Sequence, residues 1–220
     1  MQSHIKGTTA FRYLEFDLDP GDRLFAEGGS MSSMSPNLGM KVRLMGGWIS
    51  SIARKILGNE SLFISEYSNL TSKSERITLA SPCPGDVLAI ELKGESICVE
   101  PGAYICSTPG VKIATRWAGI TAFLGKFGLF KLLVSGEGTI WIAGYGGFVE
   151  RALDGEFIVD TGHLVAYDPG IKLQTRLAAG IFSSFFGGEG LVMKLQGKGK
   201  IFLQTRSLDS LATWVNPHLF

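Results

Sequence analysis

The sequence predicts an all-β protein built from internally repeated antiparallel modules, sandwich-like or barrel-like in arrangement, with a short C-terminal helix. Three observations support this fold class. A sequence pattern recurs with a period of about 60 residues. Short β-rich segments alternate with Gly and Pro turns. The 220 residues also include 29 glycines, nearly double the usual share, without a collagen-like period. Glycines used in this way are typical of turns and bulges between many short strands.

The repeat is clearest between the middle and the last third of the chain, and a fainter copy begins at Glu27. Such periodicity indicates stacked or symmetry-related structural units. Three short sequences recur one period later: Glu100-Pro101-Gly102 as Asp160-Thr161-Gly162, Pro109-Gly110-Val111-Lys112 as Pro169-Gly170-Ile171-Lys172, and the stretch 136–142 as the stretch 197–203.

We divide the chain into a first unit at 12–80, a second at 84–150 and a third at 151–206, followed by a helix and tail at 207–220. A β unit of about 60 residues leaves unpaired edges and an incomplete core. We therefore expect the three units to pack around a pseudo-threefold axis into one compact molecule. A homo-oligomer, either a trimer or a ring, is the natural extension of this arrangement.

The individual strands follow from alternating or β-rich segments bounded by turns. Asp19-Pro20-Gly21-Asp22 and Pro84-Gly85-Asp86 are turn signals because Pro presets φ and Gly accepts positive φ. Gly136-Glu137-Gly138 and Gly197-Lys198-Gly199 are interpreted as hairpin turns. Strands are expected at 13–18, 87–92, 97–100, 103–106, 139–143, 157–160, 163–167, 192–195 and 200–205.

The tail carries the helical pattern. Ser207 can cap a helix in which Leu208, Leu211 and Val215 share one face, and Pro217 ends it. This helix is expected to dock on the sheet as a lid over an edge.

Each unit contains a Gly-rich apolar segment, and Arg43, Arg116 or Arg176 precedes it. We leave three interpretations open for these segments. They are buried in the core or an oligomer interface, they contact a membrane surface, or they form a hydrophobic ligand pocket between units. The candidate interaction residues in them are Trp48, Ile49, Phe123, Phe127, Phe130, Phe182, Phe185 and Phe186.

The third unit carries the most specific motif of the chain, Phe185-Phe186-Gly187-Gly188-Glu189-Gly190 running on to Leu203-Gln204-Thr205-Arg206-Ser207. It resembles the altered-inheritance-of-mitochondria family, which is grouped with a fold like that of the tryptophan RNA-binding attenuation protein. The segment at 58–63 and the turn at 84–86 also resemble the family pattern. The resemblance implies duplicated β modules that assemble into ring-like or threefold oligomers. It implies no enzymatic activity and no cofactor.

Neither the location nor the ligands of relatives are transferred by this resemblance. Eukaryotic members of the family are associated with the mitochondrial inner membrane, but this chain does not begin with an Arg- and Ser-rich transit sequence. RNA or tryptophan binding is not inherited either, because fold does not fix function.

Catalysis finds little support in the sequence. The three histidines are His4, His163 and His218, and His163 alone is a candidate for acid–base chemistry. No zinc, nucleophile-elbow or phosphate-loop spacing is present. The recurring acids Glu27, Glu100, Asp160, Asp22 and Asp86 are interpreted as local hydrogen-bond acceptors in turns rather than metal ligands. We therefore predict no enzyme, no cofactor and no metal.

Charge and cysteine content restrict partners and location. A net charge of +1 gives no long-range field for nucleic acid. Nucleic acid is therefore not favoured as a partner. Three cysteines without a CxxC pair indicate reduced thiols. No signal peptide and no long apolar run of transmembrane length is evident. A cytoplasmic protein, at most peripheral to a membrane, is expected. The candidate anion contacts are Lys112, Arg116, Lys172 and Arg176.

The sequence thus predicts a non-enzymatic scaffold or assembly protein. We expect a homo-oligomer that contacts a membrane surface or a protein partner through the apolar segments. The alternative is a module that binds a small hydrophobic molecule at the unit interfaces, with RNA binding less favoured.

Overall fold

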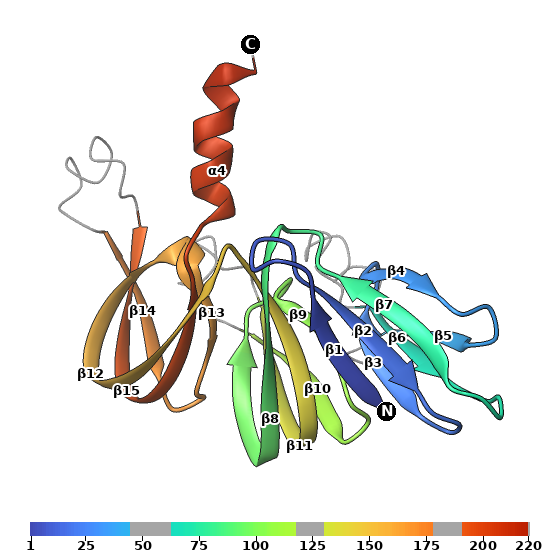
Figure 1. The fold of residues 1–220 in the computed structure, drawn as a ribbon. Coiled ribbons are helices and arrows are strands. Elements are labelled where there is room, and N and C mark those ends of the chain that lie inside the picture. The colour runs from blue at the N-terminus through green and yellow to red at the C-terminus, as the bar shows by residue number, and fades with distance from the viewer. Residues whose placement is uncertain (45–62, 118–129, 178–190, 220) are drawn as a thin grey trace.

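The computed structural model describes residues 1–44, 63–117, 130–177 and 191–219 (Figure 1). This part of the chain is almost entirely antiparallel β-structure, with one α-helix at its C-terminal end. The all-β fold class and the C-terminal helix are therefore confirmed. The elements are β1 Gln2–Lys6, β2 Tyr13–Leu18, β3 Arg23–Glu27, β4 Met31–Met34, β5 Gly39–Leu44, β6 Phe63–Ser68, β7 Glu75–Ala80, β8 Gly85–Val99, β9 Tyr104–Ser107, β10 Val111–Trp117, β11 Phe130–Tyr145, β12 Phe148–Asp160, β13 Leu164–Tyr167, β14 Lys172–Leu177, β15 Leu191–Gln204 and α4 Leu208–Val215, with short 3-10 helices η1 Thr161–His163 and η2 Asn216–His218.

The second and third units share one pattern of strand pairing. In the second unit β8 lies along β11, and β9 and β10 pair with the two halves of β11. In the third unit β12, β13 and β14 make the same pairings with β15. The registers also correspond, because Thr115 faces Leu132 and Thr175 faces Met193. The offsets between these positions are those of the sequence repeat.

The first unit has the same order of pairing with each long strand broken in two. β2 and β3 take the place of β8, and β6 and β7 take the place of β11. β4 pairs with β7, and β5 pairs with β6. The buried Asn69 stabilises the break between β6 and β7, since its side-chain amide donates hydrogen bonds to the carbonyls of Leu18 and Lys73, both at 2.7 Å. The pseudo-threefold axis and the unit boundaries stay predictions.

Neighbouring units are joined by short antiparallel pairings. We call the contact of β9 with β3 the first junction and the contact of β13 with β8 the second junction. They occupy corresponding positions in the units, and Figure 1 shows the resulting groups of strands in succession. The facing residues are Phe25 and Ser107, Ala26 and Cys106 in the first junction, and Cys98 and Tyr167, Val99 and Ala166 in the second.

Each junction also inserts side chains of one unit into the core of the unit before it. Trp141 of the second unit packs its ring edge-on against Phe16 of the first, with ring centroids 4.9 Å apart. In the second junction Phe202 and Val165 join the core of the second unit, against which Ile90 packs. A unit therefore completes its core with residues of its successor.

Two predicted hairpin turns are wrong. Gly136 and Gly138 lie inside the continuous strand β11, where the pairing with β8 shifts register between Ser135 and Glu137. Gly138 has a φ of 140°, and a Cβ atom there would collide with the Thr108 hydroxyl oxygen. Gly197 and Gly199 also lie inside a continuous strand, β15, whose pairing with β12 stays in regular register through both glycines. Gly136 is therefore a bulge residue, and the strands predicted at 192–195 and 200–205 form one long strand.

The helix α4 forms as predicted but does not dock on the sheet. Ser207 caps it, because its hydroxyl accepts a hydrogen bond from the backbone N–H of Ser210 at 3.3 Å. None of the helical residues is buried, and Trp214 is 66% exposed. Figure 1 shows α4 projecting away from the strands. The expected lid is therefore wrong, because α4 buries none of its residues against the described strands.

The Trp141 insertion gives a stability prediction. Trp141→Ala removes a ring that is only 3% exposed and leaves a cavity beside Phe16. We expect a loss of about 3–5 kcal/mol in the free energy of unfolding, measured by urea denaturation. The matched control, Trp214→Ala on the exposed helix, is expected to change it by no more than about 0.5 kcal/mol. Equal effects of the two substitutions would contradict the junction packing.

Candidate interaction surface

The three Gly-rich apolar segments each join two paired strands. The strands that flank them pair up to their last residues: Leu44 with Phe63, Trp117 with Phe130, and Leu177 with Leu191. The strand ends that bound the segments therefore lie at corresponding places in the three units. The candidate residues Trp48, Ile49, Phe123, Phe127, Phe182, Phe185 and Phe186 lie outside the described residues, and so does the side chain of Phe130.

The four candidate anion contacts lie at corresponding positions of two strands. Lys112 and Arg116 are on β10, and Lys172 and Arg176 are on β14. Lys112, Arg116 and Lys172 are exposed, and within the described residues none of them pairs with a carboxylate. The side chain of Arg176 is outside the described residues. These cations lie on two separate hairpins, and anion binding stays a prediction.

Arg116 has a basic neighbour that sequence reasoning missed. It lies directly opposite Lys131 on β11. The Lys131 ammonium turns toward the third unit, where it donates to the Tyr167 hydroxyl at 3.2 Å and lies 5.5 Å from the ring centroid. Like charges that face each other across a strand pair repel. This contact directs Lys131 away from Arg116 and into the second junction.

The corresponding arginine of the first unit is neutralised by a buried acid. Arg43 lies 2.5 Å from a carboxylate oxygen of Glu66, and Arg23 lies 3.7 Å from the other oxygen. Glu66 is 6% exposed. The Glu66 oxygen nearest Arg43 lies within ion-pair distance without a well-aligned hydrogen bond. A partly buried ion pair of this kind offsets the cost of burying the carboxylate.

Glu27 ends β3 beside the first junction and is half-buried. Burial raises the pKa of its carboxyl to about 7. Nearby, the Tyr104 hydroxyl lies 3.1 Å from the Phe25 carbonyl and 2.9 Å from the Ser107 hydroxyl. The sequence predicts the side chain of Glu27 as a hydrogen-bond acceptor in the turn. In the structure the backbone carbonyl of Glu27 is the acceptor instead, because the N–H and the hydroxyl of Ser30 both donate to it.

The other recurring acids behave more as predicted. Asp22 accepts a hydrogen bond from the backbone N–H of Asp19, and Asp86 accepts one from that of Val87, both at 2.8 Å. These two are local acceptors in turns. His163 lies in η1 rather than in a strand, with Nδ1 2.7 Å from the Gln204 carbonyl and Nε2 3.7 Å from Asp160.

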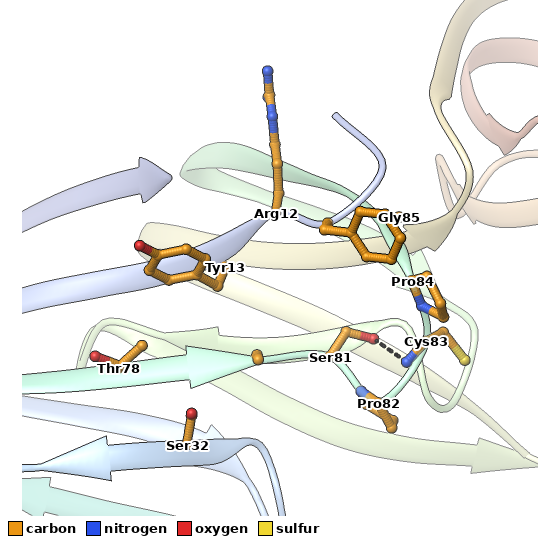
Figure 2. Close-up of a pocket in the computed structure, with 11 residues that line it drawn as sticks. Arg12, Tyr13, Ser32, Thr78, Ser81, Pro82, Cys83, Pro84 and Gly85 are labelled. Atoms are coloured by element: carbon orange, nitrogen blue, oxygen red, sulfur yellow. Dashed lines mark hydrogen bonds between the residues drawn. The ribbon is translucent and has the colours of Figure 1, made fainter. Parts of the chain in front are cut away.

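A pocket lies where β2, β4 and β7 of the first unit meet the chain that leads into β8 (Figure 2). Ser32 of β4 and Thr78 of β7 lie together on one wall, and Arg12 and Tyr13 lie on another. Cys83 donates its backbone N–H to the Ser81 hydroxyl at 3.2 Å. The lining combines the Phe11 and Tyr13 rings and two prolines with hydroxyls and a thiol. The hydrophobic ligand pocket expected between units would be formed by the apolar segments, which lie outside the described residues, so it stays a prediction.

Metal-binding clusters and membrane-spanning helices are absent from the described residues. No three His, Cys, Asp or Glu side chains there come together as a metal site. No helix among them has the length and apolar character needed to cross a membrane. All three cysteines are free thiols, and Cys98 and Cys106 are buried.

Comparison with known proteins places these features in a family context. Residues 3–206 match the family model described as mitochondrial biogenesis AIM24. An uncharacterised protein of Streptococcus pyogenes serotype M6 is 26% identical, over all of this chain and 91% of the relative. The crystal structure of a Streptococcus pyogenes protein is similar with a TM-score of 0.80 and 26% identity, covering 99% of each chain.

Glu27 gives a prediction about pH. Because its pKa in the folded protein is about 7 against 4.5 ordinarily, the folded state holds this proton to higher pH than the unfolded chain does. The free energy of unfolding is therefore expected to fall as pH rises from about 4.5 to 7, by roughly 3 kcal/mol at most.

Urea denaturation across this pH range checks it. Glu27→Gln is expected to flatten the pH dependence, whereas Glu95→Gln, at an exposed position, is expected to leave it unchanged. The same slope in Glu27→Gln and in the natural sequence would rule out Glu27 as its source.

Proposed function

We propose, from the premise that this chain belongs to the mitochondrial biogenesis AIM24 family, that it is a non-enzymatic scaffold protein. In this proposal it forms a homo-oligomer that presents its three apolar segments to a membrane surface. The observation that carries the proposal is the corresponding placement of the segments, each between two strands that pair to their last residue. Three equivalent segments give one molecule several contacts, and contacts that act together strengthen binding.

The side chains at the bases of these segments support a membrane surface as the partner. Val42 and Phe63 are exposed beside the first segment, at 61% and 47%. Lys112, Arg116 and Lys172 are exposed on the strands that lead to the other two. Apolar side chains flanked by cations are typical of contacts with an anionic bilayer surface. We propose a cytoplasmic protein with peripheral membrane contact.

The oligomer rests on the same repeated architecture. Units that complete each other's cores within one chain provide surfaces that can also associate between chains. A ring like that of the tryptophan RNA-binding attenuation protein is one form that such an oligomer can take. Binding of RNA is not part of the proposal, because the basic side chains are few and spread along two strands.

Liposome flotation tests the membrane contact. The natural sequence is expected to float with vesicles made from equal parts of phosphatidylserine and phosphatidylcholine, and to float less with vesicles of phosphatidylcholine alone. The double variant Phe185→Ser and Phe186→Ser is expected to lose at least tenfold in the bound fraction, since it removes two aromatic side chains from the third segment.

A matched control distinguishes this effect from a general loss of apolar surface. Leu70→Ser changes a side chain that is 85% exposed and lies away from the three segments. It is expected to float like the natural sequence. Absence of the natural sequence from the floated fraction would overturn membrane contact, and capture of a protein partner by the same segments would replace it.

A further inference from the structure

Two strand edges of the molecule correspond to edges that are paired in the junctions. The strands β9 and β13 each pair with the preceding unit, and β4 is their counterpart in the first unit. On the other side of each junction, β9 pairs with β3 of the first unit and β13 pairs with the end of β8 of the second unit. The end of β12 is the corresponding segment of the third unit. Within the described residues β4 pairs with β7 alone, and β12 pairs with β15 alone. This part of the chain therefore ends in two complementary edges without a strand partner.

Burial differs sharply between the paired edges and these two. In the second junction Cys98 is 3% exposed and Tyr167 is fully buried. Ile158, which corresponds to Cys98, is 64% exposed, and β4 is exposed at Met31 and through its two serines. An isoleucine at a free edge is costly to leave in water.

The positions that would pair carry none of the charged residues or prolines with which proteins normally protect exposed edges, although Glu156 and Asp160 flank the pairing positions of β12. The residues of β4 are Met-Ser-Ser-Met, and those at 157–159 of β12 are Phe-Ile-Val. The pairing of β4 with β7 shifts register between Met31 and Ser33, but β9 and β13 have a shift at the corresponding place and still pair with the preceding unit. The backbone groups of both edges are therefore suited to another strand.

The side chains beside the two edges can also face each other across a junction, but they are polar rather than aromatic. In the first junction Phe16 meets Trp141. The strand registers place Arg151 at the position of Phe16 and Thr78 at the position of Trp141. A guanidinium would thus face a hydroxyl where the first junction has two rings. Thr78 and Ser32 form a wall of the pocket in Figure 2, so the space that a large side chain would fill is open.

We infer that β4 of one copy pairs antiparallel with the end of β12 of a second copy, forming a third junction between molecules. The register of the two internal junctions places Met34 opposite Ile158 and Ser33 opposite Val159. The contact is head-to-tail, so copies associate into a closed ring or a longer array. The Arg151–Thr78 pair makes this junction more polar than the internal ones, which suits a reversible association. The inference rests on the proposed homo-oligomer and names its contact surface.

Disulfide trapping between two different chains tests the register. One chain carries Met34→Cys and the other carries Ile158→Cys with a second tag, both with Cys83→Ser; Cys98 and Cys106 are buried. Mixing and mild oxidation are expected to give a cross-linked heterodimer on a non-reducing gel, with a disulfide between positions 34 and 158 identified by mass spectrometry. The control pairs Met34→Cys with Val149→Cys, whose residue is also exposed on β12 but lies ~30 Å along the strand; it is expected to stay unlinked.

Light scattering after size exclusion measures the association itself. Ile158→Lys is expected to weaken it at least tenfold. Thr78→Phe with Arg151→Ile places in the third junction the residue types that Phe202 and Ile90 supply at the corresponding positions of the second, and it is expected to strengthen the association at least tenfold. An oligomer that persists unchanged in Ile158→Lys, without cross-linking, overturns this junction and leaves the proposed homo-oligomer intact. A monomer at every concentration overturns both. A disulfide within one chain that carries both cysteines would place the third junction inside the molecule and overturn pairing between copies.

Discussion

The fold depends on one constraint: a single β unit of this chain is too small to close its own core. Each junction supplies two things that the preceding unit lacks. A short strand pairs with the sheet of that unit, and a large side chain enters the core of that unit. Trp141 and Phe202 occupy corresponding positions and play this second role in successive junctions. The backbone ladder sets the register, and the register brings each of these rings to the apolar residues it covers. Strand pairing and core packing therefore depend on the same register at each junction.

Charge at the junctions follows the same geometry. Glu66 is buried in the first unit and lies beside two arginines, whereas Lys131 of the second unit turns to the Tyr167 hydroxyl of the third. Glu66 lies in the middle of β6, whereas Lys131 lies near the start of β11 and reaches across the second junction. The Lys131 contact thus favours the native register of the second junction, because a shifted register would separate Lys131 from Tyr167.

Much of the fold can be predicted from the sequence because turns and alternation are local signals. The strand Tyr13–Leu18 is predicted with its observed bounds, and the Ser207 cap is correct. Gly136 and Gly138 mislead because positive φ serves a turn and a bulge equally well, and only the pairing partner decides. Helix docking could not be predicted, since it depends on a surface formed by distant strands. At the candidate site the corresponding places of Arg116 and Arg176 are visible in the repeat, whereas Lys131 opposite Arg116 requires the register.

The position of Trp141 has a consequence for synthesis of the chain. The strands of the first unit end with β7 at Ala80, but the ring that covers Phe16 belongs to β11, the last long strand of the second unit. As the polypeptide leaves the ribosome, the first unit therefore waits with an open apolar face until the second has largely emerged. Its successor waits in turn for Phe202, in the last long strand of the third unit. Each unit therefore completes its core only after the following unit has been synthesised. A nascent chain of this kind is a natural client for chaperones that bind exposed apolar surface.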